Sequence, residues 1–162
     1  MSAQGSPFQQ DKARELLARE HFIIVCGHYE GIDQRFIDTC VDEEISIGDF
    51  VLTGGEIPAM AVADAVCRMV PGVLPDETAF QEESHWNGLL EYPQYTHPAE
   101  WRGLEVPPVL LSGHHANIAR WRHKMSLKRT RRDRPDLFAQ WAPQDKQDKK
   151  ILAEILAEEQ ED

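Results

Sequence analysis

The sequence predicts an α/β domain followed by a helical domain, and two observations support this fold class. Strand-like and helix-like segments alternate in the first half of the 162-residue chain, which is typical of a mainly parallel sheet with helices on its faces. From His114 onward the pattern is helical to the end. Hydrophobic residues make up 41% of the chain, which is enough for a packed core and too many for a disordered chain.

The elements of the first half follow from composition and periodicity. Residues 9–20 have the composition of a helix, with Leu16 and Leu17 on one side. Residues 21–26 are a short, apolar, β-branched run that is typical of a strand buried on both faces, and two glycines then bracket a sharp turn at 27–31. The predicted elements that follow are a helix over 32–40, a strand over 44–47, a loop over 49–55 and a helix over 56–69 that Pro71-Gly72 ends.

The second half has a different pattern. Residues 73–90 are acidic and lack periodicity, so we expect a linker or a mobile segment there. The prolines between 91 and 112 limit regular structure. Pro135 and Pro143 each lie where the first turn of a helix is expected. The final helix is predicted to have aliphatic side chains on one face and acidic side chains on the other.

Charge is segregated along the chain. The 17 Lys and Arg against 28 Asp and Glu give a net charge of −11, which taken alone argues against a nucleic-acid partner. Residues 114–134, however, carry a net charge of +7, because this segment has eight cationic residues and only one carboxylate. A chain of this kind can present a basic face to a polyanion. The eight cations are Arg120, Arg122, Lys124, Lys128, Arg129, Arg131, Arg132 and Arg134.

Cysteine usage and hydropathy favour a cytoplasmic protein without a membrane partner. Cys26, Cys40 and Cys67 form no CxxC pair, and an odd number of cysteines is typical of reduced, mostly buried thiols. The N-terminus lacks a secretory pattern, and no apolar run approaches the ~20 residues of a membrane span. His114-His115 has no further ligands at a recognisable spacing, so we expect no metal site.

Two glycine turns are the candidate ligand-binding features. One turn covers residues 27–31, after a predicted strand, and the other lies in residues 46–56 (SIGDFVLTGGE), ahead of a helix N-terminus with free N–H groups. Glycines let a backbone approach a ligand closely, and ligands of open α/β sheets bind beyond the carboxyl ends of the strands. Each turn by itself is also compatible with an ordinary tight turn, and neither matches a nucleotide-binding fingerprint.

Side chains suited to catalysis occur at two further places. Arg68 lies in a small, apolar helix, where it could stabilise negative charge on a substrate or pair with one of the many carboxylates. Glu82 and Glu83 lie in the acidic linker. A carboxylate there can become a general base once closure desolvates it, or it can be solvated surface.

Longer strings resemble a known family. VCGHYEGID (25–33), SIGDFVLTGGEIPAM (46–60) and PPVLLSGHHANIARWR (107–122), together with PGVL (71–74) and GLLEYPQYTHP (88–98), closely resemble bacterial tRNA (guanine-N1)-methyltransferases, the TrmD family of the SPOUT class. The resemblance runs from about Ser2 to about Phe138. It implies a methyltransferase domain that ends in a deep trefoil knot, a rare exception to unknotted topology.

The resemblance also implies the ligands and the assembly. The expected methyl donor is S-adenosylmethionine, with magnesium as an assisting ion, and the expected substrate is tRNA, methylated on the guanosine next to the anticodon, position 37. We expect a homodimer whose active site joins the knot of one subunit to the linker and C-terminal domain of the other. The cofactor-binding positions carried over are Ser2, Ala3, Gly5, Gly27, Glu30, Ile47, Gly48, Asp49, Phe50, Val51, Leu52, Gly54, Gly55 and Pro58.

Catalytic roles follow from the same resemblance. Arg68 matches the family's catalytic arginine, and Glu83 stands five residues before Gly88, where the family usually has Asp. Glutamate keeps the general-base chemistry and reaches one methylene farther. The positions expected to bind tRNA are Arg120, Arg122, Lys124, Lys128 and Arg129.

The resemblance implies three parts and a truncation. Residues 1–74 are expected to be the C-terminal portion of the knotted domain, residues 75–92 the interdomain linker and residues 93–162 a helical tRNA-binding domain. Family members begin with further strands before the position of Ser2. The chain is therefore predicted to be an N-terminally truncated fragment, with an unpartnered strand edge and impaired cofactor affinity and dimer stability.

Three interpretations stay open at this point. The chain is an active tRNA methyltransferase, or a catalytically impaired fragment that retains only tRNA binding or dimerisation, or an acidic interaction protein with no role on RNA. Salt-dependent binding of tRNA would exclude the third.

Overall fold

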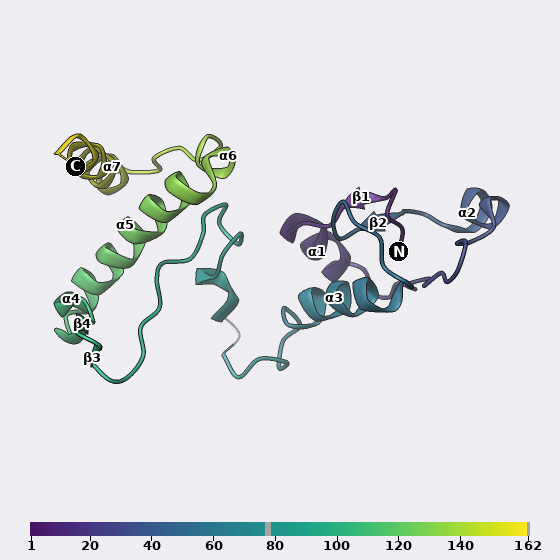
Figure 1. Cartoon of the computed structure of the whole chain (residues 1–162), viewed down its shortest axis with the longest axis horizontal. Coiled ribbons are helices and arrows are strands. Elements are labelled where there is room, and N and C mark those ends of the chain that lie inside the picture. The colour runs from purple at the N-terminus through teal and green to yellow at the C-terminus, as the bar shows by residue number, and fades with distance from the viewer. Residues whose placement is uncertain (77–78, 162) are drawn as a thin grey trace. The chain divides into compact units, whose positions relative to one another are not determined.

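The computed structural model describes residues 1–76 and 79–161 and has mixed α/β structure. Residues 77 and 78, which fall in the predicted linker, lie outside the described residues. The chain divides into two compact units, Met1–Phe80 and Gln81–Asp162 (Figure 1). We describe each unit by itself.

The first unit combines short parallel strands with three helices. Strand β1 pairs with β2 in parallel, with Ser6 opposite Ile45. Helix α1 lies against α3, and Ala13 of α1 and Val62 and Val66 of α3 are buried. The elements are β1 (Ser6–Pro7), α1 (Gln10–Leu17), α2 (Gln34–Cys40), β2 (Ile45–Ser46) and α3 (Glu56–Cys67).

Most predicted elements of the first unit are confirmed, but the strand predicted over 21–26 is wrong. This segment has no regular structure, and its Ile23 side chain is 85% exposed. A strand needs a neighbour to satisfy its N–H and C=O groups, and no strand of the described residues pairs with this segment. The amino group of Met1 donates to the carbonyl oxygen of Val25 at 2.8 Å instead.

The second unit is mainly helical, with one hairpin that the sequence did not predict. Strands β3 and β4 pair antiparallel around Arg102 and Gly103, both with positive φ, as a two-residue hairpin turn requires. The elements are a short 3₁₀ helix (Ala79–Glu82) at the boundary with the first unit, β3 (Glu100–Trp101), β4 (Leu104–Glu105), α4 (Pro108–Leu111), α5 (His115–Asp133), α6 (Pro135–Phe138) and α7 (Lys146–Glu161).

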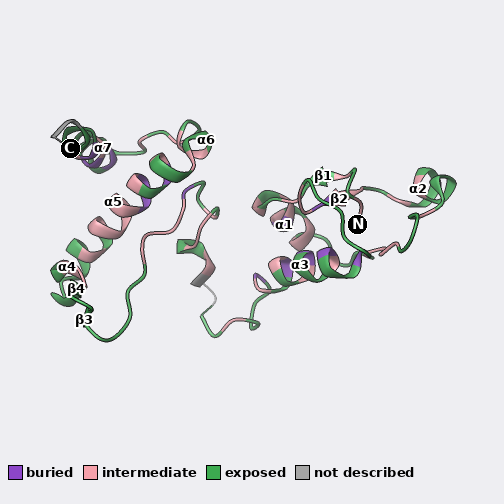
Figure 2. Ribbon diagram, viewed as in Figure 1, coloured by how far each residue is buried: buried purple, intermediate pink, exposed green. Residues whose placement is uncertain are grey.

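The core of the second unit joins α5 and α7. Buried positions lie on both helices (Figure 2), and Leu127, Ile151 and Ile155 are fully buried there beside Leu89. Pro135 begins α6 as predicted. Pro143 does not begin α7, because Asp145 caps this helix: its carboxylate accepts the backbone N–H of Asp148 at 2.8 Å.

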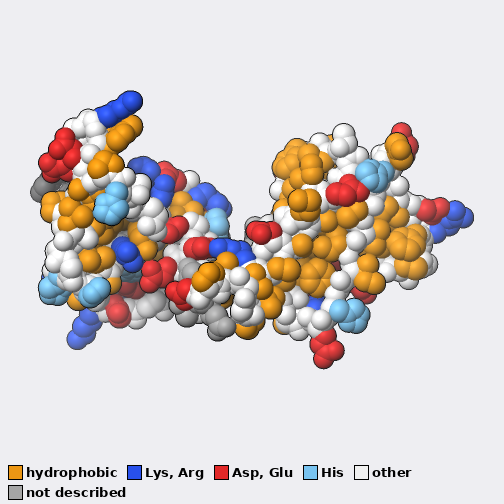
Figure 3. Space-filling view, turned by 90° about the horizontal axis from the view of Figure 1, so that it is seen from below, with side chains coloured by type: hydrophobic (Ala, Val, Ile, Leu, Met, Phe, Trp, Pro, Cys, Tyr) orange, Lys and Arg blue, Asp and Glu red, His pale blue; other side chains and the backbone are white. Residues whose placement is uncertain are grey.

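Apolar side chains cover much of the face of the first unit that Figure 3 shows. Exposed examples are Val51, Ile57 and Met60, and such surface is typical of an interaction face. All three cysteines are free, but Cys40 and Cys67 are exposed, so the expectation of mostly buried thiols is wrong. Within the described residues, no helix is both long enough and apolar enough to cross a membrane.

Candidate functional site

A cavity of about 340 Å³ lies between the two glycine turns of the first unit. Binding sites for small ligands usually have volumes in this range. All of the predicted cofactor positions line this cavity except Gly5 and Asp49. The two turns, far apart in the sequence, therefore form one concave surface.

Three contacts fasten the two turns to each other. The backbone N–H of Gly55 donates to the carbonyl oxygen of Gly27 at 3.0 Å, and His28 forms an isolated antiparallel bridge with Gly54. The His28 Nε2 atom lies 2.5 Å from a carboxylate oxygen of Glu56. Sequence reasoning missed the role of His28, because the pairing of the turns has no signal in local composition.

Glycine is required where the turns meet. A Cβ on Gly55 would lie 2.8 Å from the Cα of Cys26, and a Cβ on Gly54 would lie 2.5 Å from a Glu56 carboxylate oxygen. The contact at Gly55 is with backbone, so it cannot be relieved by moving a side chain, whereas the contacts at Gly54 are with the side chains of Glu56 and His28. Gly55 thus allows the close approach of the two turns at the cavity.

The loop that follows β2 is shaped by Ser46. Its hydroxyl donates to the carbonyl oxygen of Gly48 at 3.0 Å and accepts the Gly48 N–H at 3.2 Å. Gly48 has a φ of 149°, a backbone angle that residues with a side chain rarely adopt. The loop then presents Phe50, Val51 and Leu52 to the cavity.

Glu30 reaches the cavity from a strained turn. Tyr29 has φ of 55° and Gly31 has φ of 108°, and the Gly31 N–H donates to the His28 carbonyl oxygen at 3.0 Å. Glu30 is exposed at this turn. A carboxylate in this position can accept hydrogen bonds from ribose hydroxyls or an amine.

Two predicted cofactor positions do not line the cavity. Gly5 lies where β1 approaches β2, and a Cβ there would sit 2.4 Å from the carbonyl carbon of Glu44. Its role is therefore to permit strand contact. Asp49 is exposed and lies outside the cavity lining.

Arg68 lies at the C-terminal end of α3, where it is half-buried. Its backbone N–H donates to the carbonyl oxygen of Asp64 at 3.0 Å. Val62 and Val66 on the same helix are buried, so α3 holds the backbone of Arg68 on a packed element.

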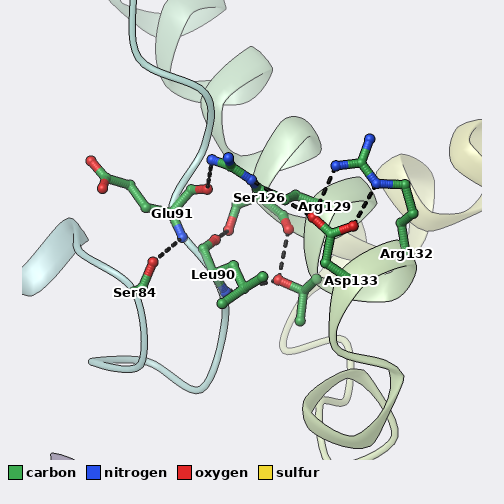
Figure 4. A network of polar contacts seen from close by, with 8 residues as sticks. Ser84, Leu90, Glu91, Ser126, Arg129, Arg132 and Asp133 are labelled. Atoms are coloured by element: carbon green, nitrogen blue, oxygen red, sulfur yellow. Dashed lines mark hydrogen bonds and ion pairs between the residues drawn. The ribbon is translucent and has the colours of Figure 1, made fainter.

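Glu83, the predicted general base, belongs to the second unit and directly precedes a segment that is fastened to α5 (Figure 4). The N–H of Glu91 donates to the Ser84 hydroxyl at 2.9 Å. The N–H of Leu90 donates to the Thr130 hydroxyl at 2.8 Å, and the Ser126 hydroxyl donates to the Leu90 carbonyl oxygen. Glu83 itself is half-buried. The C-terminal part of the predicted linker is thus tied to a helix.

The cations of α5 meet the carboxylates of α7. The pKa of Glu154 is lowered by its hydrogen bond with Arg120, and the pKa of Glu158 is lowered by hydrogen bonds with Lys124 and Lys128. The partners of each pair lie far apart in the sequence, so the charge pattern of residues 114–134 alone did not predict the pairs. The nitrogen-to-oxygen distances are 2.6 Å for Arg120–Glu154, 3.5 Å for Lys124–Glu154, 2.5 Å for Lys124–Glu158, 2.9 Å for Lys128–Glu158 and 2.9 Å for Arg131–Glu159.

The other predicted tRNA-binding cations contact the segment that follows Glu83. Arg122 lies over the Tyr92 ring at 4.7 Å, and burial raises the pKa of Tyr92. Arg129 donates to the carbonyl oxygen of Glu91 at 3.2 Å. Both cations lie on α5, and their nearest carboxylates are Glu82, 3.7 Å from Arg122, and Asp133, 3.9 Å from Arg129.

Residues 1–76 and 79–161 contain no cluster of candidate metal ligands. No group of three or more His, Cys, Asp or Glu side chains there is arranged to hold an ion. The expected magnesium therefore has no cluster of three or more such ligands in this part of the chain.

Comparison with known proteins gives a consistent result. A family model described as tRNA (Guanine-1)-methyltransferase TrmD matches residues 1–140. A curated tRNA (guanine-N(1)-)-methyltransferase from Ruminiclostridium cellulolyticum is 63% identical over 138 residues, which are 85% of this chain and 59% of that protein. A relative with the same description from Desulforamulus reducens is 56% identical over 155 residues, 96% of this chain and 61% of that protein.

A third relative, from Heliobacterium modesticaldum, is 57% identical over 158 residues, which are 98% of this chain and 58% of that protein. It carries the same description, tRNA (guanine-N(1)-)-methyltransferase. The chain spans about three fifths of the length of these curated relatives. With a family model matched over most of its length, the chain belongs to the TrmD family of tRNA (guanine-1)-methyltransferases.

Proposed function

We propose that the chain transfers a methyl group from S-adenosylmethionine to N1 of a guanine in tRNA, at position 37 next to the anticodon. The observation that carries the proposal is the cavity in which the two glycine turns meet, in a chain of the TrmD family. The relatives are named as tRNA (guanine-N(1)-)-methyltransferases, which supports the reaction type.

The cavity suits the methyl donor in size and in chemistry. Its volume of about 340 Å³ and its backbone-rich walls accept an adenosine and a short amino-acid tail. Glu30 is placed to accept hydrogen bonds from polar groups of the donor, and Leu52 and Pro58 supply apolar wall. When bound, the donor supplies an electrophilic methyl group on a sulfonium, so no covalent enzyme intermediate is needed.

The reaction requires a base, because guanine N1 carries a proton at neutral pH. We assign this role to the Glu83 carboxylate, which takes the N1 proton. The N1 electron pair forms the new bond to the methyl carbon, the carbon–sulfur bond breaks, and the sulfur leaves as a thioether. Negative charge develops on guanine O6, and the Arg68 guanidinium is assigned to stabilise it.

Several coarser features belong to the same proposal. Residues 1–74 are assigned to the trefoil-knotted domain, residues 75–92 to the interdomain linker and residues 93–162 to the tRNA-binding domain. The active form is a homodimer that shares its active site between subunits. The exposed apolar side chains of the first unit support association of this kind.

Methyl transfer to tRNA transcripts tests the proposal. We expect tritium from labelled S-adenosylmethionine to enter a transcript with guanosines at positions 36 and 37, and a transcript with adenosine at 37 to remain unlabelled. Glu83→Gln should lower kcat by about 10²–10⁴-fold, and Arg68→Ala by about 10²–10³-fold. The matched control is Glu105→Gln, which removes an exposed carboxylate of the hairpin and should retain activity. Full activity of Glu83→Gln at neutral pH would remove the base assignment.

One observation favours a second candidate function, tRNA binding without methyl transfer. Residues 21–26, a run typical of a buried strand, have no strand partner in the described part, and they lead into the first glycine turn of the cavity. Filter binding of tRNA together with no incorporation of tritium would support this alternative. Incorporation above the adenosine-37 background would reject it.

A further inference from the structure

Helix α7 presents a row of carboxylates to the cations of α5. Glu154 contacts Arg120 and Lys124, and Glu158 contacts Lys124 and Lys128, at distances of 2.5 to 3.5 Å. Glu159 extends the row to Arg131. Three of the five cations predicted to bind tRNA thus already have a carboxylate partner on α7.

The spacing of this row resembles that of a polyanion. Arg120, Lys124 and Lys128 follow one another at four-residue intervals, so they stand about 6 Å apart along one side of α5. Glu154 and Glu158 repeat the same interval on α7. The carboxylates therefore place charge where successive phosphates of an RNA strand would place it.

The carboxylates of α7 can separate from the cations of α5 without loss of the fold. The Glu154 and Glu158 side chains are 32% and 44% exposed, and ion pairs of this kind are weak and screened by salt. By contrast, Ile151 and Ile155 hold α7 against Leu127 in the buried core. The carboxylates can swing away while the helix stays in place.

Helix α7 also lies outside the part that the family model describes. The model matches residues 1–140, and α7 covers Lys146–Glu161. The cations of α5 fall inside the match, and their carboxylate partners fall beyond it.

We propose that the carboxylate row of α7 (Glu154, Glu158 and Glu159) is an internal competitor for RNA phosphates on the cation row of α5. This inference rests on tRNA as the partner in the proposed function. The α5 row is then a phosphate-binding surface whose affinity α7 reduces. Binding of RNA exchanges each carboxylate for a phosphate, so the surface favours ligands that contact several cations at once.

The competition has a signature in salt dependence. Salt weakens RNA binding, and the slope of log K against log salt is more negative by about 0.7 to 0.9 for each phosphate contacted. Salt also weakens the internal pairs, which offsets part of this loss. Removing the carboxylates removes the offset, so the slope should become steeper by up to that amount for each cation released.

The test compares two triple variants of equal charge. Glu154→Gln, Glu158→Gln and Glu159→Gln remove the row. The control, Glu20→Gln, Asp38→Asn and Asp42→Asn, changes exposed carboxylates of the first unit. Both raise the net charge of −11 by three. The probes are a tRNA transcript in filter binding, from about 50 to about 200 mM KCl, and elution from immobilised heparin. Circular dichroism reports the helix content, and Glu158→Gln alone serves if the triple variant loses helix.

The expected result is a Kd at least tenfold lower for the row variant than for the control, with a steeper salt slope and later elution from heparin. Equal affinity and equal slope for the two variants, with tRNA bound by both, overturns the competitor role alone. Later heparin elution of the row variant with no tRNA binding by any chain supports the competitor role while removing tRNA as the partner. No difference on either probe overturns the inference.

Discussion

Thr130→Val is the most direct test of how the second unit holds the segment that follows Glu83. The Thr130 hydroxyl accepts the Leu90 N–H at 2.8 Å and donates to the Ser126 carbonyl oxygen at 2.8 Å. Thr130 is fully buried, so water does not replace the hydroxyl. Valine keeps the shape of the side chain but leaves the Leu90 N–H without an acceptor.

The magnitude follows from that unpaired donor. A buried donor that loses its partner costs about 1–3 kcal/mol, and we expect the free energy of unfolding of the second unit to fall by about 2 kcal/mol. With a urea m-value of about 1 kcal/mol/M for a small domain, the unfolding midpoint moves down by about 2 M. A loss of this size also speeds hydrogen exchange at the Leu90 amide by about 30-fold if exchange follows the same opening.

Tryptophan fluorescence measures this unit selectively, because Trp86, Trp101, Trp121 and Trp141 all lie in it. The control is Thr130→Ser, which keeps the hydroxyl and loses one methyl group, at a cost of about 1 kcal/mol. Its Leu90 amide should stay protected. The reasoning is refuted if Thr130→Val unfolds within about 0.5 kcal/mol of the parent chain, or if both variants expose the Leu90 amide equally.

Three further predictions concern the cavity, the core and the acid side of the pH profile. Gly55→Ala should weaken S-adenosylmethionine binding at least tenfold in calorimetry, because its Cβ would lie 2.8 Å from the Cα of Cys26; unchanged affinity would contradict the close-approach argument. Ile155→Ala should destabilise the second unit by about 2–5 kcal/mol in urea unfolding, since the side chain is fully buried; a loss below 1 kcal/mol would show that the core collapses around the gap. Burial acts to raise the pKa of Asp148, but hydrogen bonds from the Gln144 backbone N–H and from His123 together outweigh it, so that this pKa is lowered. Its contribution to stability is therefore present above the unfolded pKa of about 4 and lost as pH falls through the lower folded value. With Asp148→Asn, the urea unfolding midpoint in the same fluorescence assay should fall less between pH 5 and pH 3 than it does in the parent chain. An unaltered dependence on pH would contradict this assignment.

Helices were predictable because their signals are local. The aliphatic spacing of α1 and the small apolar residues of α3 are visible within single windows of sequence. The run at 21–26 has equally strong local features, but a strand exists only beside a partner, and none pairs with this run in the described residues. The parallel pairing of β1 with β2 spans about forty residues, so β2 was predicted from its own composition, whereas the two-residue β1 has no recognisable pattern alone.

The candidate site was predictable in part. The resemblance placed both glycine turns at one cofactor site, and they line one cavity. The fastening of the turns through His28 and Glu56 depends on a distance of 2.5 Å between residues 28 positions apart, which no spacing rule reveals. The charge of residues 114–134 is visible in the sequence, but the pairing of Lys124 with Glu158, 34 positions farther along the chain, is not.

The exposed thiols allow the distance between the two units to be followed by resonance energy transfer. Cys26, Cys40 and Cys67 all belong to the first unit, whereas every tryptophan belongs to the second. A dye attached to exposed Cys40 or Cys67 accepts energy only from indoles of the other unit within one chain. The native sequence thus carries separate donors and acceptors, and the efficiency of transfer reports on the spacing of the two units as tRNA or the methyl donor is added.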